Sequence, residues 1–344
     1  IAAYRKSVAA KPDVFESNLN LGLMLARAGQ QEGEQFLRAA TKLKPTSNPA
    51  EGQARAWLSL ARLVENTKPD QALEAYRQVA ALQPKDPEPH LSAGLLLENL
   101  KRFEDSEQEY KQAVLLQPDS TEAVTGLANL FMRSRRFTEA EQMLRKLTAM
   151  RPDNVAAHVQ LGRILAALGR NEDAVAELET AAGLAPGDEA AQRDLADLYV
   201  ATGKYDQAEA RYRPLLQAKP NEAELHHGLG RVLLKQGRFP EAQEQLLLAV
   251  KLKPNFGAAY GDLAAAANEN KNYELAIRAL DERGKFLPEI PVGYFLRATA
   301  YDHLRDYKQA AENYHRFLEL ANGKYPDQEW QARHRLIAIE PKKK

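Results

Sequence analysis

The sequence lacks cysteine and lacks net charge. None of its 344 residues is a cysteine, which excludes disulfides, thiolate metal sites and cysteine nucleophiles. Its 47 Lys and Arg residues balance 47 Asp and Glu residues, so the formal net charge at pH 7 is zero. Nucleic acid and anionic membranes both call for a basic surface. The charge balance therefore argues against either as the main partner.

Long apolar runs are also missing. No stretch approaches the roughly 20 apolar residues that a membrane-spanning helix requires, so the sequence predicts no membrane insertion. No secretory signal is visible, but the chain opens on "IAAYRKSVAAKP", which looks like the middle of a repeat. A removed signal is therefore compatible with the sequence. The short basic run "PKKK" at the other end is expected to be solvated rather than to form a binding patch.

Catalytic motifs are absent from the sequence as well. The phosphate-binding G-x-x-x-x-G-K, the dinucleotide-binding G-x-G-x-x-G, the zinc-binding H-E-x-x-H and the nucleophile elbow G-x-S-x-G do not occur. Acidic residues are abundant, but charged helix surfaces are ordinary, and carboxylates alone do not identify a hydrolase. The sequence therefore shows no catalytic constellation, and we predict a protein that is not an enzyme and holds no cofactor.

A regular period is present instead. Proline recurs at a constant spacing, and small residues (alanine, glycine or, once, serine) keep the same spacing at two further positions. The prolines are Pro84, Pro118, Pro152, Pro186, Pro220, Pro254 and Pro288. Their period lies within the range of roughly 20 to 50 residues that is typical of a solenoid built from stacked supersecondary units.

Each period contains two helical patterns. In "LGRILAALGRNEDAVAELETAAGLAP", Leu161, Ile164 and Leu165 follow the three-four spacing of one helix face. Gly169 then stands where a helix would end. A second amphipathic pattern follows, and Pro186 prevents it from continuing. The sequence therefore predicts an all-α protein made of helix hairpins, in which each short helix is stabilised by its neighbours.

The repeated residues resemble the tetratricopeptide repeat, whose pattern is W-x-x-L-G-x-x-Y…A…F…A…P with the same period as the prolines. In the unit above, Leu161–Gly162 occupies the Leu-Gly pair, Ala174 the first alanine and Pro186 the closing proline. Trp57 supplies the tryptophan once. The resemblance implies a right-handed superhelical solenoid of helix hairpins that binds proteins or peptides.

The family pattern divides the chain into nine motifs in one continuous array over residues 15–322. Their expected bounds are 15–48, 49–86, 87–120, 121–154, 155–188, 189–222, 223–256, 257–290 and 291–322. Residues 1–12 are expected to form the second helix of a truncated motif. Residues 326–339 are expected to form a closing helix with Trp330, Leu336 and Ile337 on one face.

Two irregularities accompany the period. Pro45 and Pro84 stand farther apart than one period, and we interpret the intervening "PTSNPAEG" as a surface loop. His90, His158 and His226 are spaced by two periods each, which indicates either duplication of a two-hairpin unit or independent packing choices. Two repeats separate these histidines by roughly 20 Å or more, whereas zinc binds each nitrogen at about 2 Å. We therefore predict core histidines and no metal site.

The resemblance places ligands on the concave face, which the first helix of each motif lines at its fifth and ninth positions and partly at its sixth. The candidate groove residues are Leu19, Leu23, Leu58, Arg62, Leu91, Leu95, Asn129, Arg163, Arg193, Asp194, Asp197 and Arg231. The early positions are rich in leucine and the middle ones are charged. We therefore hypothesise a groove for a peptide or partner helix with an apolar and a polar end. In the alternative, the leucines pack against neighbouring helices and the charges are solvated.

Three functions fit this interpretation. The first is a protein-interaction scaffold without catalysis, whose partner is a protein or peptide. The second is the repeat region of a larger enzyme, of glycosyltransferase or sulfotransferase type, with its catalytic domain outside this chain. The third is a soluble assembly factor exported to a bacterial envelope, which the cysteine-free composition permits. A receptor for chaperone tails is not indicated, because Asn129 stands with Thr125 where the family's carboxylate clamp has Asn with Lys.

Overall fold

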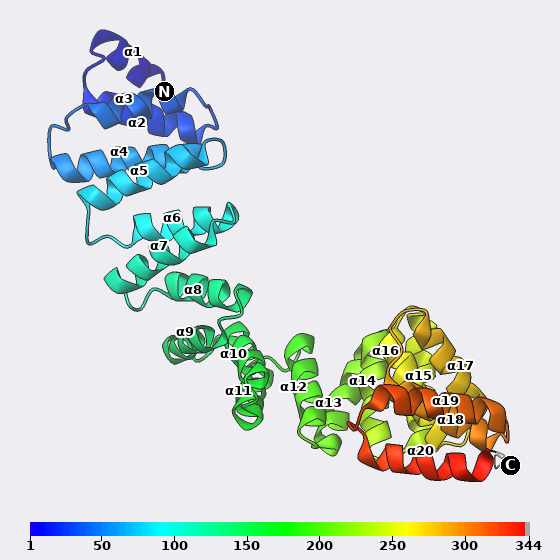
Figure 1. Ribbon diagram of the computed structural model, residues 1–344. Helices are drawn as coiled ribbons and strands as arrows, with labels where there is room; N and C mark the ends of the chain where they lie inside the picture. The colour runs from blue at the N-terminus through cyan, green and yellow to red at the C-terminus, as the bar shows by residue number, and fades with distance from the viewer. Residues whose placement is uncertain (341–344) are drawn as a thin grey trace. The chain divides into compact units, whose positions relative to one another are not determined.

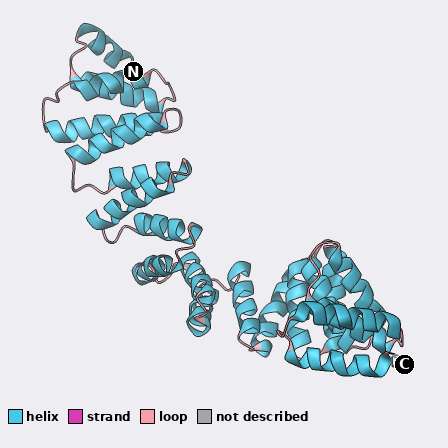
Figure 2. Cartoon of the chain, viewed as in Figure 1, coloured by secondary structure: helices cyan, strands magenta, loops and turns pink. Residues whose placement is uncertain are grey.

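A computed structural model describes residues 1–340 of the chain, and every regular element in that range is an α-helix. Twenty helices follow one another without a strand among the described residues (Figures 1 and 2). The predicted all-α class is confirmed. The "PKKK" tail lies outside the described residues.

The chain forms two compact units, Ile1–Leu168 and Gly169–Lys344. The helices of unit 1 are α1 (Ala2–Ala10), α2 (Phe15–Arg27), α3 (Gly33–Lys42), α4 (Pro49–Val64), α5 (Pro69–Leu82), α6 (Glu88–Asn99), α7 (Phe103–Leu116), α8 (Thr121–Arg133), α9 (Phe137–Met150) and α10 (Val155–Ala167). Those of unit 2 are α11 (Asn171–Leu184), α12 (Glu189–Ala201), α13 (Tyr205–Ala218), α14 (Ala223–Lys235), α15 (Phe239–Leu252), α16 (Gly257–Glu269), α17 (Tyr273–Gly284), α18 (Pro291–His303), α19 (Tyr307–Ala321) and α20 (Pro326–Ile339).

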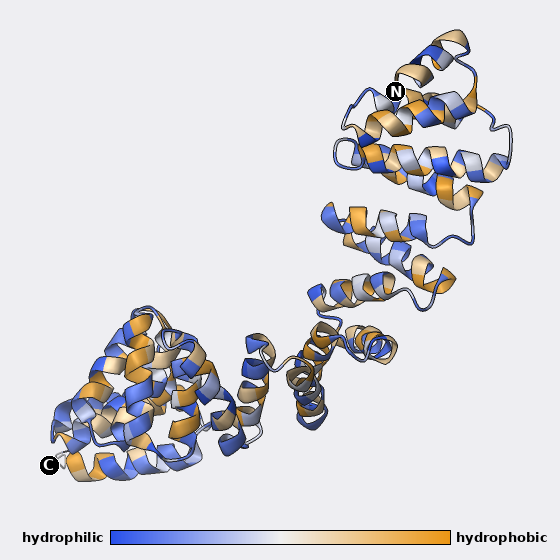
Figure 3. Cartoon of the chain, turned by 180° about the vertical axis from the view of Figure 1, so that it is seen from behind, coloured by the Kyte–Doolittle hydropathy of each residue, from blue (hydrophilic) through white to orange (hydrophobic). Residues whose placement is uncertain are grey.

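Within each unit the helices stack as hairpins. The first helix packs on its second, as α4 does on α5 and α14 on α15, and the second packs on the first helix of the next hairpin. First helices also contact each other, as in α6 with α8 and α14 with α16. Figure 3 shows apolar and polar residues sharing most helices, as expected when each helix buries one side.

The turn inside most of the hairpins contains a residue with a left-handed backbone. Gly169, Gly203 and Gly237 have φ between +74° and +76° there, a conformation that glycine adopts without strain. Lys101 and Lys271 occupy the equivalent position with φ of +60°. For residues other than glycine this conformation is destabilising by about 1–2 kcal/mol. The position can therefore end the helix without glycine, but with a loss of stability.

Glycine on the first helices makes room for tyrosine on the second. A Cβ added at Gly94 or Gly126 would lie 2.8 Å or 2.5 Å from the Tyr110 ring. The ring therefore lies between α6 and α8, and the Tyr110 hydroxyl donates a hydrogen bond to Glu98 at 3.0 Å. Burial raises the pKa of Tyr110, with a further contribution from the Glu98 charge, so this phenol remains a donor at neutral pH.

Two of the three spaced histidines belong to the core, whereas His90 is only partly buried and its Nδ1 lies 2.7 Å from Glu109 Oε2. His158 and His226 are buried, and each Nε2 donates to the carbonyl of the preceding repeat proline, Pro152 or Pro220, at 3.1 Å and 2.9 Å. Asn18 and Gln192 make the same bond to their own upstream prolines. A polar residue at this position therefore ties the inter-repeat loop to the next helix. Among the described residues no group of His, Cys, Asp and Glu is arranged to hold a metal ion.

A series of ion pairs connects consecutive hairpins along the second helices. In at least four hairpins of the described residues, the basic residue that precedes the second helix reaches an acidic residue on the second helix before it. These pairs are Lys68–Glu34, Arg102–Asp70, Arg136–Glu107 and Arg238–Glu209, with N–O distances of 2.7 to 3.1 Å. Sequence reasoning on apolar periodicity did not anticipate this inter-repeat ladder.

Two expectations about local structure were wrong. The stretch "PTSNPAEG" is only partly a loop, because α4 begins at Pro49 and its proline suits the first turn of a helix. In α20, Leu336 is buried while Trp330 and Ile337 are 61% and 74% exposed. The separation of Trp330 and Ile337 is about two helical turns, so these two share a face, whereas Leu336 lies on another. Helix α20 therefore buries the Leu336 side chain and exposes those of Trp330 and Ile337.

Candidate functional site

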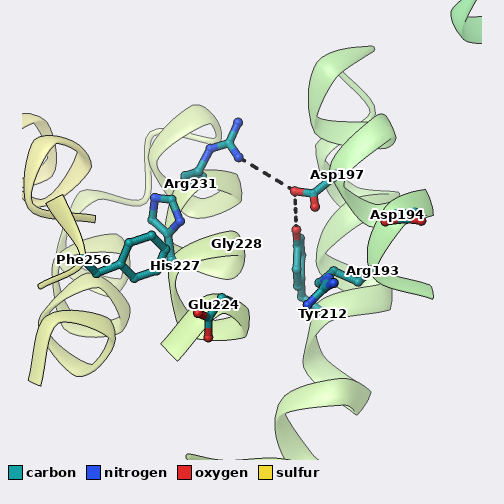
Figure 4. Close-up of a pocket in the computed structure, with 9 residues that line it drawn as sticks. All are labelled: Arg193, Asp194, Asp197, Tyr212, Glu224, His227, Gly228, Arg231 and Phe256. Carbon is teal, nitrogen blue, oxygen red and sulfur yellow. Dashed lines mark hydrogen bonds and ion pairs between the residues drawn. The ribbon is translucent and has the colours of Figure 1, made fainter. Parts of the chain in front are cut away.

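A pocket of about 370 Å³ lies on unit 2 between the first helices α12 and α14 (Figure 4). It is lined by Arg193, Asp194 and Asp197 from α12, Tyr212 from α13, Glu224, His227, Gly228 and Arg231 from α14, and Phe256 from the loop before α16. Residues three and four apart share one face of a helix. The spacing of the pocket residues on α12 and α14 therefore turns them toward each other, while their apolar neighbours enter the core.

Tyr212 forms the floor of the pocket. A Cβ at Gly228 would stand 2.4 Å from the Tyr212 ring, so only glycine lets the ring cross beneath α14. The Tyr212 hydroxyl donates to Asp197 Oδ1 at 2.7 Å. Burial raises the pKa of Tyr212, and the negative charge of Asp197 raises it further. The phenol is therefore a fixed donor, and Asp197 is held as an acceptor.

The other carboxylates around the pocket are also engaged by the protein. His227 Nε2 lies 2.7 Å from Asp262 Oδ2. Lys253 Nζ donates to Glu224 at 2.6 Å, and this bond is the main cause that lowers the pKa of Glu224. Asp194 has an interaction partner too. Each of these acidic groups therefore already has at least one partner within the protein.

The two arginines are less engaged. Arg231 lies 3.8 Å from Asp197 Oδ1 and 3.9 Å from Asp262 Oδ2, beyond the usual range of an N–H···O hydrogen bond. Among the described residues Arg193 forms no ion pair or hydrogen bond. The guanidinium groups therefore keep donors available to a ligand.

One wall of the pocket is aromatic. The rings of His227 and Phe256 meet edge to face with their centroids 4.7 Å apart. Lys253 Nζ lies over the Phe256 ring, 5.0 Å from its centroid. The pocket therefore combines hydrogen-bond donors with a ring surface that can pack against an apolar side chain.

The structure brings four of the sequence-predicted groove residues together in this pocket, namely Arg193, Asp194, Asp197 and Arg231. The other eight lie in unit 1 and do not form one site. Leu19 is 5% exposed and belongs to the core, which differs from the expected ligand contact. Its apolar side chain is used between helices, as the alternative interpretation of the leucines proposed.

The remaining candidates of unit 1 differ in exposure. Leu23 and Leu58 are partly buried against the core, and Leu91 is also partly buried. Leu95 is 50% exposed, which is the most open position among these leucines. The polar candidates Arg62, Asn129 and Arg163 are exposed, and Arg62 forms an ion pair with Glu88 at 2.8 Å.

Sequence reasoning missed several residues of the pocket. Phe256 precedes its helix, so a rule based on first-helix positions cannot select it. Tyr212 occupies a second-helix position that normally belongs to the core. One signal was available: glycine follows tyrosine at the same spacing in Tyr110–Gly126 and in Tyr212–Gly228, which marks a ring that passes under the next first helix.

Comparison with known sequences identifies the class of protein. Two sequence models described as tetratricopeptide repeat match the chain, one over residues 125–189, 193–255 and 227–285, the other over residues 63–130. The chain belongs to the tetratricopeptide repeat family. No curated protein matches it at a significant level. The repeats indicate a scaffold for protein–protein interaction.

Solved structures share this fold at low sequence identity. YrrB, described as a tetratricopeptide repeat protein with an unusual peptide-binding site, is 21% identical with a TM-score of 0.51, and the match covers 54% of this chain and 96% of YrrB. A tetratricopeptide repeat protein from Parabacteroides merdae is 15% identical with a TM-score of 0.55, covering 71% and 96%. The Cut9–Hcn1 hetero-tetramer of APC/C gives 17% identity and a TM-score of 0.54, covering 87% of this chain and 59% of that one. Within the described residues, no helix is both long and apolar enough to cross a membrane.

Proposed function

We propose that this chain is a non-enzymatic scaffold that binds a peptide segment of a partner protein in the pocket between α12 and α14. The observation that carries the proposal is the contrast in this pocket between acidic groups bound to protein donors and two arginines with free capacity. Such a site is suited to hold a ligand, because the arginine N–H donors can bind it without breaking hydrogen bonds inside the protein. The family assignment supports a protein as the partner.

The chemistry of the pocket supports binding rather than catalysis. A general acid or base works best when its pKa lies near the operating pH. Hydrogen bonding lowers the pKa of Glu224, and burial raises that of Tyr212. Both shifts move these groups away from neutral pH and keep each in one protonation state.

Unit 1 supplies a separate apolar contribution to the proposal. Leu95 is the exposed leucine among the candidate positions, and Leu91 lies one helical turn before it on α6. We propose that this surface contacts an apolar side chain of a partner. The core position of Leu19 removes it from that surface.

Panning a display library of random peptides tests the proposal. The wild-type chain should enrich a family of related peptides, whereas the double variant Phe256→Ala and Arg231→Ala should not. Arg278→Ala is the matched control, because Arg278 is an exposed arginine of the same unit outside the pocket. Circular dichroism and thermal unfolding verify that the variants fold. Enrichment of the same peptides by the double variant, or of none by the wild type, contradicts the proposed function.

A further inference from the structure

We infer that the surface between the second helices α7 and α9 joins two copies of this chain in a two-fold dimer, in which Leu115 of each copy enters an apolar pocket of the other. The inference goes beyond the proposed function, because it concerns unit 1 and a different partner. It is carried by a cavity, by an exposed side chain beside that cavity, and by the departure of both from the repeat pattern.

The pocket between α7 and α9 has a volume of about 310 Å³. Val114 of α7 and Met143 of α9 form its apolar walls, and both side chains are partly buried. Leu127 and Phe131 of the first helix α8 are buried and form its floor. The methionine side chain is unbranched and adapts to the shape of its neighbour. The pocket therefore fits an apolar side chain.

Leu115 stands at the edge of this pocket and is 72% exposed. It follows Val114 directly on α7 and lies four residues after Lys111, and both of these residues line the pocket. Residues three and four apart share one face of a helix, so Leu115 continues the pocket-lining stripe of α7. Covering an apolar side chain that projects into water is favourable. A projecting leucine and an apolar pocket thus lie side by side on one surface.

Both features depart from the repeat pattern. Positions that lie whole periods away from Leu115 hold small or polar residues, namely Ala81, Ala149, Gly183, Gln217, Lys251, Lys285 and Glu319. Those that lie whole periods away from Met143 do so as well, namely Ala75, Glu109, Glu177, Arg211, Gln245, Ala279 and Asn313. The other hairpins therefore fold without a large apolar residue at either position. Packing of the hairpin does not require Leu115 or Met143, which leaves contact with a partner as their use.

A second copy of the chain matches this surface. In a two-fold interface, residue i of one copy contacts residue j of the other, and j contacts i. Leu115 and the pocket wall at Met143 meet that requirement, because each copy presents both of them on the same surface. A single two-fold rotation therefore fills two pockets and covers two exposed leucines.

The charges beside the pocket agree with self-association. Lys111 and Arg136 both bind Glu107, each at 2.7 Å. Arg136 also binds Glu139 at 2.9 Å, so positive and negative groups are already paired within one copy. A surface of this kind attracts neither a basic nor an acidic partner, and it does not repel its own copy. The chain as a whole has no net charge, a condition that promotes association.

Sedimentation velocity over a wide range of protein concentration measures the association. Two variants each remove one side of the contact: Leu115→Gln copies Gln217 of α13, and Met143→Gln copies Gln245 of α15. Because other hairpins hold glutamine at these positions, both variants should fold, as circular dichroism and thermal unfolding verify. Leu184→Gln is the control, since Leu184 is an exposed leucine of α11 outside the proposed interface.

We expect the wild type and the control to dimerise alike. Burial of one leucine contributes about a factor of 10 to 100 in affinity. The two-fold axis repeats each substitution in both contacts. Leu115→Gln and Met143→Gln should therefore each weaken dimerisation about 100-fold or more.

A mixture of the two variants, with one of them fluorescently labelled, is the most specific arm. In the mixed dimer one contact keeps Leu115 of one copy and Met143 of the other, while both substitutions fall in the second contact. If the two side chains touch, the second substitution in a broken contact removes little more. The mixed dimer should therefore be about 10-fold or more tighter than the dimer of either variant alone.

A wild type that stays monomeric at every concentration would overturn the inference. Dimerisation that neither Leu115→Gln nor Met143→Gln weakens would overturn it too. A mixture that associates no better than the separate variants would show that the leucine and the pocket do not meet, with the same consequence. Peptide binding to the pocket between α12 and α14 should be equal in all these variants, so the proposed function is tested separately.

Discussion

Single glycines decide how closely the hairpins of this protein approach. Gly228 stands against the Tyr212 ring with space for hydrogen only, and Gly126 does the same for Tyr110. In both cases the tyrosine passes between two first helices. For Tyr212 its hydroxyl then meets a carboxylate that lines the proposed site. Packing at one residue is thus coupled to the geometry of the binding pocket.

Gly228→Ala should destabilise the protein. The added Cβ would lie 2.4 Å from the Tyr212 ring, and overpacking of this kind costs about 1–3 kcal/mol. The measurement is the free energy of unfolding in urea. Gly183→Ala is the control, because Gly183 lies in α11 with nothing near its Cβ position. That change should stabilise the helix by about 0.5 kcal/mol. Equal stability of Gly228→Ala and the wild type would contradict the packing argument.

Leu95→Ser should leave stability nearly unchanged and weaken the contribution of unit 1 to partner binding. Leu95 is half exposed, and surface substitutions usually alter stability by less than about 0.5 kcal/mol. Leu58→Ser is the contrasting variant, since Leu58 packs against the core and its loss should lower the free energy of unfolding. Thermal unfolding and peptide affinity are measured together. A large loss of stability in Leu95→Ser would show that this leucine is structural.

At the scale of the helix, the turns and the inter-repeat ladder determine where each element ends and how it joins the next. The turn position accepts glycine or a strained basic residue, and the ladder begins directly after it. The turn and the inter-repeat ion pair recur in several hairpins because the hairpins share one sequence pattern. Each can therefore be tested in one hairpin with another as its control.

Gly203→Ala should cost about 1–2 kcal/mol through the backbone alone. The φ of Gly203 is +75°, and no atom lies near its Cβ position, so steric contact with neighbours contributes nothing. Lys271→Ala is the control, because Lys271 already holds a left-handed backbone with φ of +60°. Its replacement should change the free energy of unfolding little. A harmless Gly203→Ala would mean that the turn adapts to a side chain.

The ladder predicts a pH dependence at Glu209. Burial would raise the pKa of this carboxyl, but hydrogen bonds from Gln236, Arg213 and Arg238 outweigh burial and lower it to about 2. Because the folded pKa is depressed, the stabilisation is complete above the unfolded value near 4.5 and is lost as pH falls toward 2. Linkage sets an upper limit of about 3 kcal/mol, and we expect about 1 kcal/mol because the arginines are partly exposed.

The measurement compares the wild type with Glu209→Gln between pH 2 and pH 7. Above about pH 5 the variant should be less stable by a constant amount, and the difference should vanish toward pH 2. Glu244→Gln is the control, since Glu244 lies exposed on α15. A difference that does not depend on pH would contradict the assigned role of the Glu209 charge.

The elements show how far the sequence could predict the structure. The period, and residues such as Gly169 and Pro186, predict the hairpins because backbone conformation is a local property. The exposed Trp330 and the helical start at Pro49 were missed, since they depend on which side of a helix meets a neighbour and on how an insertion is absorbed. The apolar character of a residue specifies neither the side of the helix that meets a neighbour nor the point at which a helix begins after an insertion.

At the scale of the whole molecule, the two units offer different surfaces for binding. Positions taken from the family pattern include charged residues that meet in the pocket of unit 2, but they also include Leu19, which is core. Where the side chains at these positions are too polar to be buried, they are exposed or line the pocket. For leucine it cannot separate a ligand contact from a packing contact, because the same side chain serves both.

The solenoid also explains why the site is assembled from several repeats. In a repeat protein each unit contacts only its neighbours, and stability is approximately a sum of local terms. The pocket accordingly draws on α12, α13, α14 and the loop before α16, which lie in neighbouring repeats. Substitutions there can change ligand binding while distant hairpins keep their packing.

Hydrogen–deuterium exchange with and without a selected peptide tests the central claim most directly, because it locates the bound segment on the chain. We predict that the peptide slows exchange in α12, α14 and the loop before α16, and leaves α2 to α5 unchanged. The same measurement on the double variant Arg193→Gln and Arg231→Gln should show no protection. Protection confined to other helices, with α12 and α14 unaffected, would contradict the account.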